Sequence, residues 1–338
     1  MAVICPGYVA IMNELVRSLD AKLERIRSGA FAPEDFIIAD AKDGDMAFGV
    51  TAPGPDGRGG WKPRADHLAA IREMTESQLV DIMLLSVSSA ERLVNEGVFS
   101  GSTVTPAVRL NDTTDIWNAR GANYRASASR PFASADVASA SSICKLGLYS
   151  MTFHNDVSVD LASLEAYRRF RLEMREQPVS HFLEIFNPAF DIGIPDSDLG
   201  SYVNDMIIKA LAGVVASDQP LFLKIQYNGA AAMRELANYD PGHLVIGILG
   251  GGKGTTRDTF ELIGQAAESG ARVALFGRKI NLAEAPLELV RLMRATVEGK
   301  LTPEAAVATY HDYLTEHNIT PERALRDDME ITEAVLRV

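Results

Sequence analysis

A lysine inside an apolar run is the residue of this sequence best suited to chemistry. Lys224 lies in LFLKIQYNG (221–229), where most of its neighbours are apolar. A charged lysine is costly to bury, so desolvation at this position would favour the neutral amine. A neutral amine is the nucleophile that attacks a ketone or aldehyde to form a Schiff base. Two structural explanations compete: the side chain could reach solvent from a strand end, or a buried ion pair could hold it.

Two further charged residues lie in similar apolar runs. Lys145 lies in SICKLGLYS (142–150), and Glu184 lies in SHFLEIF (180–186). If one barrel holds all three residues, a second cation beside Lys224 would favour its neutral form. Glu184 could then move protons during imine formation and carbon–carbon cleavage. A structural Lys–Glu pair is the alternative explanation.

Oxygen-bearing side chains also lie at the ends of two of these runs. Asp40 ends the run FIIAD (36–40), and Tyr149 lies near the end of SICKLGLYS. We expect Asp40 to orient substrate hydroxyls or to join proton transfer, and Tyr149 to contact a substrate oxygen. The alternative for Tyr149 is ordinary packing. The alternative for Asp40 is a solvated acidic loop without a role in the site.

A glycine-rich motif indicates an anion site. The segment GILGGGKGTTRD (247–258) is followed by LFGRKIN (275–281). Glycines at a strand-to-helix junction allow backbone amides to approach an anion closely, and Lys253, Arg278 and Arg257 would supply charge. A tight turn with solvated cations is the alternative. The first segment also nearly fits a P-loop, but residue 254 is Gly where a nucleotide hydrolase has Ser or Thr.

Eight short apolar runs alternate with longer amphipathic segments. The runs are 36–40, 80–87, 102–110, 142–150, 180–186, 221–227, 243–249 and 271–277. Runs without polar alternation are typical of parallel strands buried on both faces. We therefore predict an α/β fold, a single (β/α)₈ TIM-barrel domain, with an open doubly wound sheet as the alternative. The barrel core would span about 36–298, after an N-terminal helical segment (1–35) and before C-terminal helices (299–338).

The barrel prediction places the motifs at one end. Chemistry in such barrels occurs at the carboxyl ends of the strands, and phosphate sites commonly follow strands 7 and 8, where the two glycine motifs lie. Two irregular segments, 44–64 and 111–135, also follow strands and would lie at the same end. They would either contribute to the site or be plain surface loops.

Composition excludes several classes of function. The 338 residues include 45 Asp and Glu against 33 Lys and Arg, a formal charge of −12, which disfavours nucleic acid as the partner. Two cysteines, Cys5 and Cys144, are too few for a disulfide framework. None of the six histidines has the spacing of a metal-ligand pair. No apolar run reaches the ~18 residues of a membrane span. We expect a cytoplasmic homo-oligomer that acts on a small molecule and needs no metal, organic cofactor or membrane.

The motifs together resemble a known family. KLGLY, LEIF, LKIQYNG, GGGKGTTRDTF and FGRKIN, in this order, resemble the class I (Schiff-base) aldolase superfamily, and most of all its tagatose-bisphosphate and sulfofructose-phosphate branch. The resemblance covers roughly residues 36–298. It implies that Lys224 forms the Schiff base and that Lys145 and Glu184 assist.

The resemblance also implies a substrate. It predicts a phosphate site at Gly251, Gly252, Gly277 and Arg278, and cleavage or formation of a phosphorylated ketose or similar anionic sugar. The first strand departs from the family, because Asp40-Ala41-Lys42-Asp43 stands where the family has Asp-Gln-Arg-Gly. A thiolase- or transaldolase-like transferase on the same barrel and a non-catalytic sugar-phosphate binding protein are the alternatives.

Overall fold

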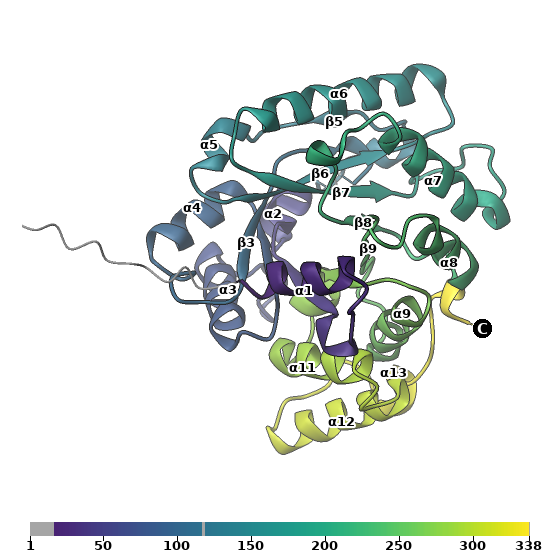
Figure 1. Cartoon of the computed structure of the whole chain (residues 1–338). Helices are drawn as coiled ribbons and strands as arrows, with labels where there is room; N and C mark the ends of the chain where they lie inside the picture. Colours follow the sequence, from purple (N-terminus) through teal and green to yellow (C-terminus); the bar gives the residue numbers. More distant parts are fainter. Residues whose placement is uncertain (1–16, 117–118, 338) are drawn as a thin grey trace, which may run out of the picture.

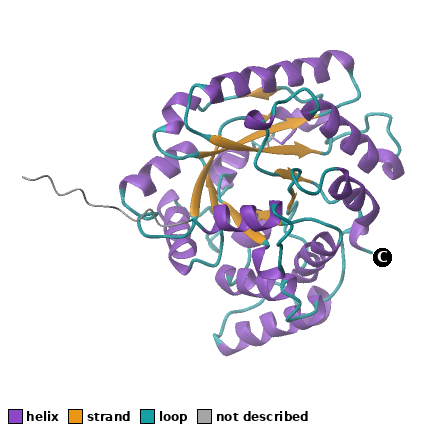
Figure 2. Ribbon diagram, viewed as in Figure 1, coloured by secondary structure: helices purple, strands orange, loops and turns teal. Residues whose placement is uncertain are grey.

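Eight parallel strands close into a barrel (Figure 2). The structure, a computed structural model, describes residues 17–116 and 119–337. The barrel order is β1-β10-β9-β8-β7-β6-β3-β2, so each strand pairs with its neighbours along the chain. The strands are β1 (Ile37–Ala41), β2 (Ile82–Leu85), β3 (Thr105–Arg109), β6 (Leu146–Thr152), β7 (Ser180–Phe186), β8 (Leu223–Ile225), β9 (Ile246–Leu249) and β10 (Val273–Phe276). Each predicted run overlaps one of them, so the TIM-barrel prediction is confirmed and the open sheet is wrong.

Helices surround the barrel (Figure 1). They are α1 (Ser18–Arg27), α2 (Gly44–Phe48), α3 (Arg64–Ser77), α4 (Val87–Asn95), α5 (Val137–Ser141), α6 (Val157–Arg175), α7 (Asp196–Leu211), α8 (Ala230–Tyr239), α9 (Thr256–Glu268), α10 (Arg278–Asn281), α11 (Pro286–Val297), α12 (Pro303–Glu316) and α13 (Leu325–Asp328). Helix α1 belongs to the predicted N-terminal helical segment, of which residues 1–16 lie outside the described part. Helices α11 and α12 pack against α9 on the outside of the barrel. No helix in the described part is long and apolar enough to cross a bilayer.

The two halves of the barrel interior differ in polarity. Toward the amino ends, inward side chains such as Ile82, Phe182 and Phe222 form one apolar cluster with Leu19 and Leu23 of α1. Helix α1 lies across this end in Figure 1 and closes it. Because side chains alternate between faces with a period of two, the next inward residue on β7 and on β8 is charged. The amino half is therefore mainly apolar, and the charged inward side chains of β7 and β8 lie in the carboxyl half.

The two irregular segments lie at the carboxyl end, as predicted. Residues 44–64 follow β1 and contain α2 and a bridge between Pro55 and Trp61. Residues 111–135 follow β3 and contain a small antiparallel pair, β4 (Asp112–Thr113) with β5 (Pro131–Phe132). Both segments border the polar half of the barrel.

Candidate active site

Lys224 and Glu184 form an ion pair inside the barrel. They are register partners on the neighbouring strands β8 and β7, and Lys224 Nζ lies 2.6 Å from Glu184 Oε1. Lys224 is 5% exposed and Glu184 1% exposed. Each follows an inward phenylalanine by two residues, so strand alternation points both side chains into the barrel. The predicted neighbourhood of this lysine and this carboxylate is confirmed.

Arg109, at the end of β3, supplies the second cation of this cluster. Its guanidinium donates hydrogen bonds to Asp43, to Ser150 Oγ at 2.7 Å and to Glu184 Oε2 at 3.0 Å. Ser150 in turn donates to Glu184 Oε2 at 2.8 Å. The sequence analysis missed Arg109, although a cation at the end of the run STVTPAVRL is the same signal that marked Lys224.

Burial and charge act in opposite directions on the groups around Arg109. Burial alone would raise the pKa of Asp43, but Arg109 and Lys224 outweigh it and hold that pKa below its usual value. At Asp112 burial dominates, and its pKa rises to about 6 despite Arg109 at 3.6 Å. Burial opposes the charge of Arg109, yet Asp43, Glu184 and Asp112 together raise its pKa. Arg109 is therefore a permanent cation, and Asp43 is an anion at neutral pH.

A cavity of about 570 Å³ opens onto this cluster from the carboxyl end of the barrel. Arg109, Glu184 and Lys224 line it, and so do Gly44, Ala47, Phe48 and Ala52 of the segment after β1. The segment after β3 contributes Asp115 and Arg125. Both irregular segments therefore form part of the cavity wall.

The glycine motifs form the cationic side of this cavity. Gly251, Gly252, Gly277 and Arg278 line it. Arg278 Nε donates to Gly251 O at 3.1 Å, and its guanidinium lies over the Phe48 ring at 5.3 Å. Partial burial, together with the charge of Arg125, lowers the pKa of Arg278. In the described part of the chain neither arginine forms an ion pair, so an anion between them would relieve their repulsion.

Lys253 does not belong to this group, contrary to prediction. Its ammonium is paired with Glu322, which follows α12, and it does not line the cavity. The hydroxyl of Thr255 also has partners, because it donates to Glu330 O at 2.7 Å and caps α9. The P-loop interpretation is therefore wrong. The sheet is a closed barrel, and Lys253 and Thr255, which a P-loop would use to bind phosphate and metal, contact the C-terminal segment instead.

The predicted position of Lys145 beside Lys224 is wrong. Lys145 precedes β6, is exposed, and donates to Ser141 O at 2.7 Å. The level of the Lys224–Glu184 pair is reached on β6 only at Ser150, the register partner of Glu184. Five residues of strand correspond to about 16 Å, so Lys145 lies at the opposite end of the barrel.

Tyr149 and Asp40 also lie away from the cavity. Tyr149 points outward from β6 and packs on Tyr167 and Phe170 of α6, with ring centroids 5.2 and 4.4 Å away. Asp40 shares the outward face of β1 with Ile38 and pairs with Lys42 at 3.0 Å. Burial raises the pKa of Asp40 even though Lys42 opposes this. Strand alternation places both residues in the layer between barrel and helices, where the prediction needed them inside.

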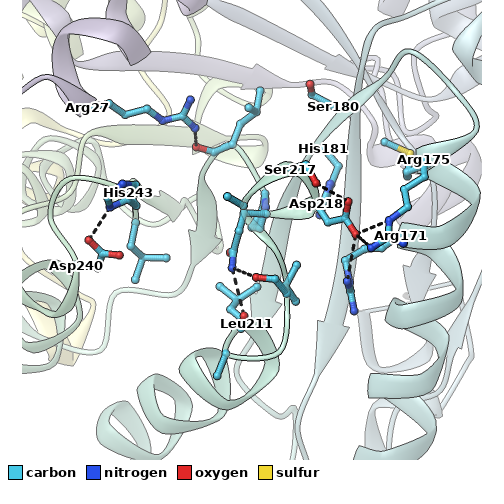
Figure 3. A pocket seen from close by; sticks show the side chains of 18 of the residues that line it. Arg27, Arg171, Arg175, Ser180, His181, Leu211, Ser217, Asp218, Asp240 and His243 are labelled. Carbon is cyan, nitrogen blue, oxygen red and sulfur yellow. Dashed lines mark hydrogen bonds and ion pairs between the residues drawn. The ribbon is translucent and has the colours of Figure 1, made fainter.

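A second cavity, of about 980 Å³, lies at the amino ends of β7, β8 and β9 (Figure 3). Although it is larger, most of its polar groups are already paired. Asp218 accepts hydrogen bonds from Arg175, and His181 hydrogen-bonds with Tyr167. Burial lowers the pKa of His181 to about 4, so this imidazole is neutral. The barrel cavity, which holds the buried lysine and carboxylate, is the better candidate for catalysis.

Groups that could hold a metal ion are absent from the residues described. No set of three or more His, Cys, Asp or Glu side chains has a suitable arrangement there. Cys144 is buried and unpaired, and Cys5 lies outside the described part.

The fold is shared with Schiff-base aldolases. An archaeal fructose 1,6-bisphosphate aldolase superposes with a TM-score of 0.61 at 17% identity, covering 83% of this chain and 99% of that one. A second archaeal structure, whose catalytic lysine is covalently bound to the carbinolamine intermediate, gives 0.61 at 18% identity over 83% and 99%. The fructose-bisphosphate aldolase of Slackia heliotrinireducens gives 0.63 at 12% identity over 87% and 90%. No protein-family model and no curated protein matches the sequence.

These similarities define the class of architecture. The chain is a (β/α)₈ barrel of the form seen in these fructose-bisphosphate aldolases. At identities of 12–18% the likeness concerns the fold. The chemistry has to be argued from the site.

Proposed function

We propose that the chain is a class I aldehyde-lyase that forms a Schiff base between Lys224 and an anionic ketose, with a phosphorylated sugar as the substrate. The observation that carries this proposal is the 2.6 Å pair of Lys224 and Glu184 inside the closed barrel, at the floor of an open cavity. A buried amine beside a proton acceptor is the arrangement that imine chemistry requires.

The first step is carbinolamine formation. Glu184 accepts a proton from Lys224, and the neutral amine attacks the substrate ketone to form a carbon–nitrogen bond. The substrate oxygen takes up the proton that the attacking amine loses and then a second proton from Glu184, and it leaves as water, which gives the iminium. Arg109 and Ser150 hold Glu184 by its other oxygen, so the carboxylate keeps Oε1 directed at Lys224.

Cleavage then uses the iminium as an electron sink. A base removes the proton of the hydroxyl on the second carbon from the iminium carbon. The bond between this hydroxyl-bearing carbon and the carbon next to the iminium carbon then breaks, and an aldehyde leaves. The electron pair of the broken bond forms an enamine, which is protonated and hydrolysed to release the second product. Glu184 is the group placed for these proton transfers, and the covalent amine supplies the sink, so the proposed reaction needs no metal or organic cofactor.

The anionic group of the substrate binds at the cationic side of the cavity. Arg278 and Arg125 supply charge there, and the backbone of Gly251, Gly252 and Gly277 allows close approach. Because β8, β9 and β10 are successive neighbours in the barrel, this corner adjoins the strand that bears Lys224.

Borohydride trapping tests the proposal. Incubation with dihydroxyacetone phosphate and borohydride should leave a stable adduct on the Lys224 peptide, found by mass mapping. Lys224→Met should lose the adduct and all turnover. Lys145→Met is the matched control, because it removes an exposed lysine at the other end of the barrel and should leave the adduct intact. Absence of any adduct with a panel of ketose phosphates, or labelling that survives in Lys224→Met, would overturn the proposal.

A further inference from the structure

The cavity contains few cations that are free to bind a substrate anion. Five cationic side chains line it, namely Lys42, Arg109, Arg125, Lys224 and Arg278. Lys42 is paired with Asp40, Arg109 with Asp43 and Glu184, and Lys224 with Glu184. Arg125 and Arg278 form no ion pair in the described part of the chain. Residues 1–16, 117–118 and 338 contain no Lys or Arg, so every cationic side chain belongs to that part.

Glutamates of the C-terminal segment pair with two more cations near the glycine motifs. Lys253 is paired with Glu322, and Lys279 lies 2.7 Å from Glu333 with none of its side chain exposed. His67 also lines the cavity, but burial lowers its pKa and leaves the imidazole neutral at pH 7. Among the described residues that line the cavity, only Arg125 and Arg278 retain a positive charge without an ion pair.

The segment after β3, which also bears Arg125, brings a buried carboxylate to the cavity wall. Asp115 lines the cavity and is 1% exposed. Its Oδ2 accepts a hydrogen bond from Thr152 Oγ1 at 3.0 Å, whereas Oδ1 has no partner among the described residues. No cation is paired with this carboxylate in the part of the chain that the structure describes. A buried carboxylate repels a second anion and favours a neutral hydrogen-bond donor.

We infer that the substrate carries a single anionic group, bound at Arg125 and Arg278, and that the rest of it is a neutral polyhydroxyl chain selected by Asp115. This inference rests on the proposed function and narrows it to sugar monophosphates over bisphosphates. Asp115 acts here as a specificity-determining residue through its charge.

The first test compares sugars that differ only in phosphate number. Borohydride trapping on Lys224 is measured with the 1-phosphate, the 6-phosphate and the 1,6-bisphosphate of fructose and of tagatose. At least one monophosphate should reach half-maximal labelling at a concentration at least tenfold below that of its bisphosphate. Equal or better labelling by the bisphosphates overturns the inference and leaves the Schiff-base function standing. Failure of all sugars to label Lys224 overturns both.

The second test changes the charge of the wall. Asp115→Asn should lower the preference for monophosphate over bisphosphate at least fivefold, because it removes the repulsion of a second anion. Asp205→Asn, an equal change of charge at an exposed position of α7, should leave the ratio unchanged. If Asp115→Asn weakens labelling by both sugars equally, Asp115 has a structural role only and the assignment to it is wrong. The comparison on the wild-type protein remains decisive if this variant does not fold.

Discussion

Lys224 Nζ and Glu184 Oε1 lie 2.6 Å apart because the two residues are register partners on adjacent parallel strands. The hydrogen-bond ladder of the barrel fixes the spacing of the two backbones, so the two side chains extend into the barrel from neighbouring positions. The amine and its proton acceptor are therefore already in hydrogen-bond contact before a substrate arrives, which is the kind of preorganisation that proton transfer during imine formation requires.

Glu184→Gln should lower the rate of Schiff-base formation and the turnover number by about 10²–10⁴-fold, because the amide cannot accept the proton of Lys224. The rate of borohydride labelling and kcat are the measurements, with circular dichroism to verify folding. Glu173→Gln, at an exposed position of α6, is the control. An unchanged labelling rate in Glu184→Gln would show that another group accepts the proton.

Arg109→Lys and Arg109→Met should separate positioning from charge. The guanidinium holds Asp43, Ser150 and Glu184 at once, which a single ammonium cannot do. Arg109→Met leaves two buried carboxylates with less compensation and should cost about 3–5 kcal/mol of unfolding free energy. Arg109→Lys should recover part of that stability but little of kcat.

Denaturant unfolding and kcat measured on the same two variants check this prediction. Full recovery of kcat in Arg109→Lys would mean that only the positive charge matters and that the several hydrogen bonds of the guanidinium do not orient Glu184.

Arg278→Gln should raise KM for a phosphorylated substrate by roughly 10–100-fold, because a charge-assisted hydrogen bond contributes about 1.5–3 kcal/mol. Lys253→Gln is the matched comparison from the same glycine region and should change KM less than threefold, since Glu322 already pairs Lys253. The measurement is KM for phosphorylated and unphosphorylated forms of one sugar. A larger effect at Lys253 than at Arg278 would contradict this placement of the anion.

Asp112→Asn should alter the dependence of stability on pH. The pKa of Asp112 is raised to about 6 in the folded protein, so the folded state binds a proton more tightly than the unfolded chain does. The contribution of Asp112 is therefore most favourable below about pH 4 and is lost as pH rises toward and through 6. Removing the charge should stabilise the protein at pH 7 by about 1–3 kcal/mol and have little effect at pH 4.

Urea unfolding of wild type and Asp112→Asn across pH 4–8 measures this difference directly. A difference in unfolding free energy that does not grow with pH would show that the carboxyl titrates as in the unfolded chain.

The sequence by itself determined the barrel and its central pair. Apolar runs without polar alternation indicate strands buried on both faces, and that pattern survives any detail of packing. Lys224 and Glu184 were recognised because a charged residue is rarely buried in an apolar run unless it forms an ion pair or belongs to a functional site. The glycine motif predicted an anion site after the last two strands, and the family resemblance placed it at Gly251, Gly252, Gly277 and Arg278.

Only the tertiary structure decided which charges meet. Strand alternation separates Ser150, inside the barrel, from Tyr149, outside it, by a single residue, and a single residue is finer than the strand boundaries predicted from the sequence. Lys145 precedes its strand and so lies at the wrong end, while Arg109 reaches the pair from a strand 115 residues before Lys224 in the chain. Lys253 is neutralised by a glutamate 69 residues away. Local patterns specify burial, but the partner of a buried charge is set by long-range closure of the barrel and by the return of the C-terminal segment.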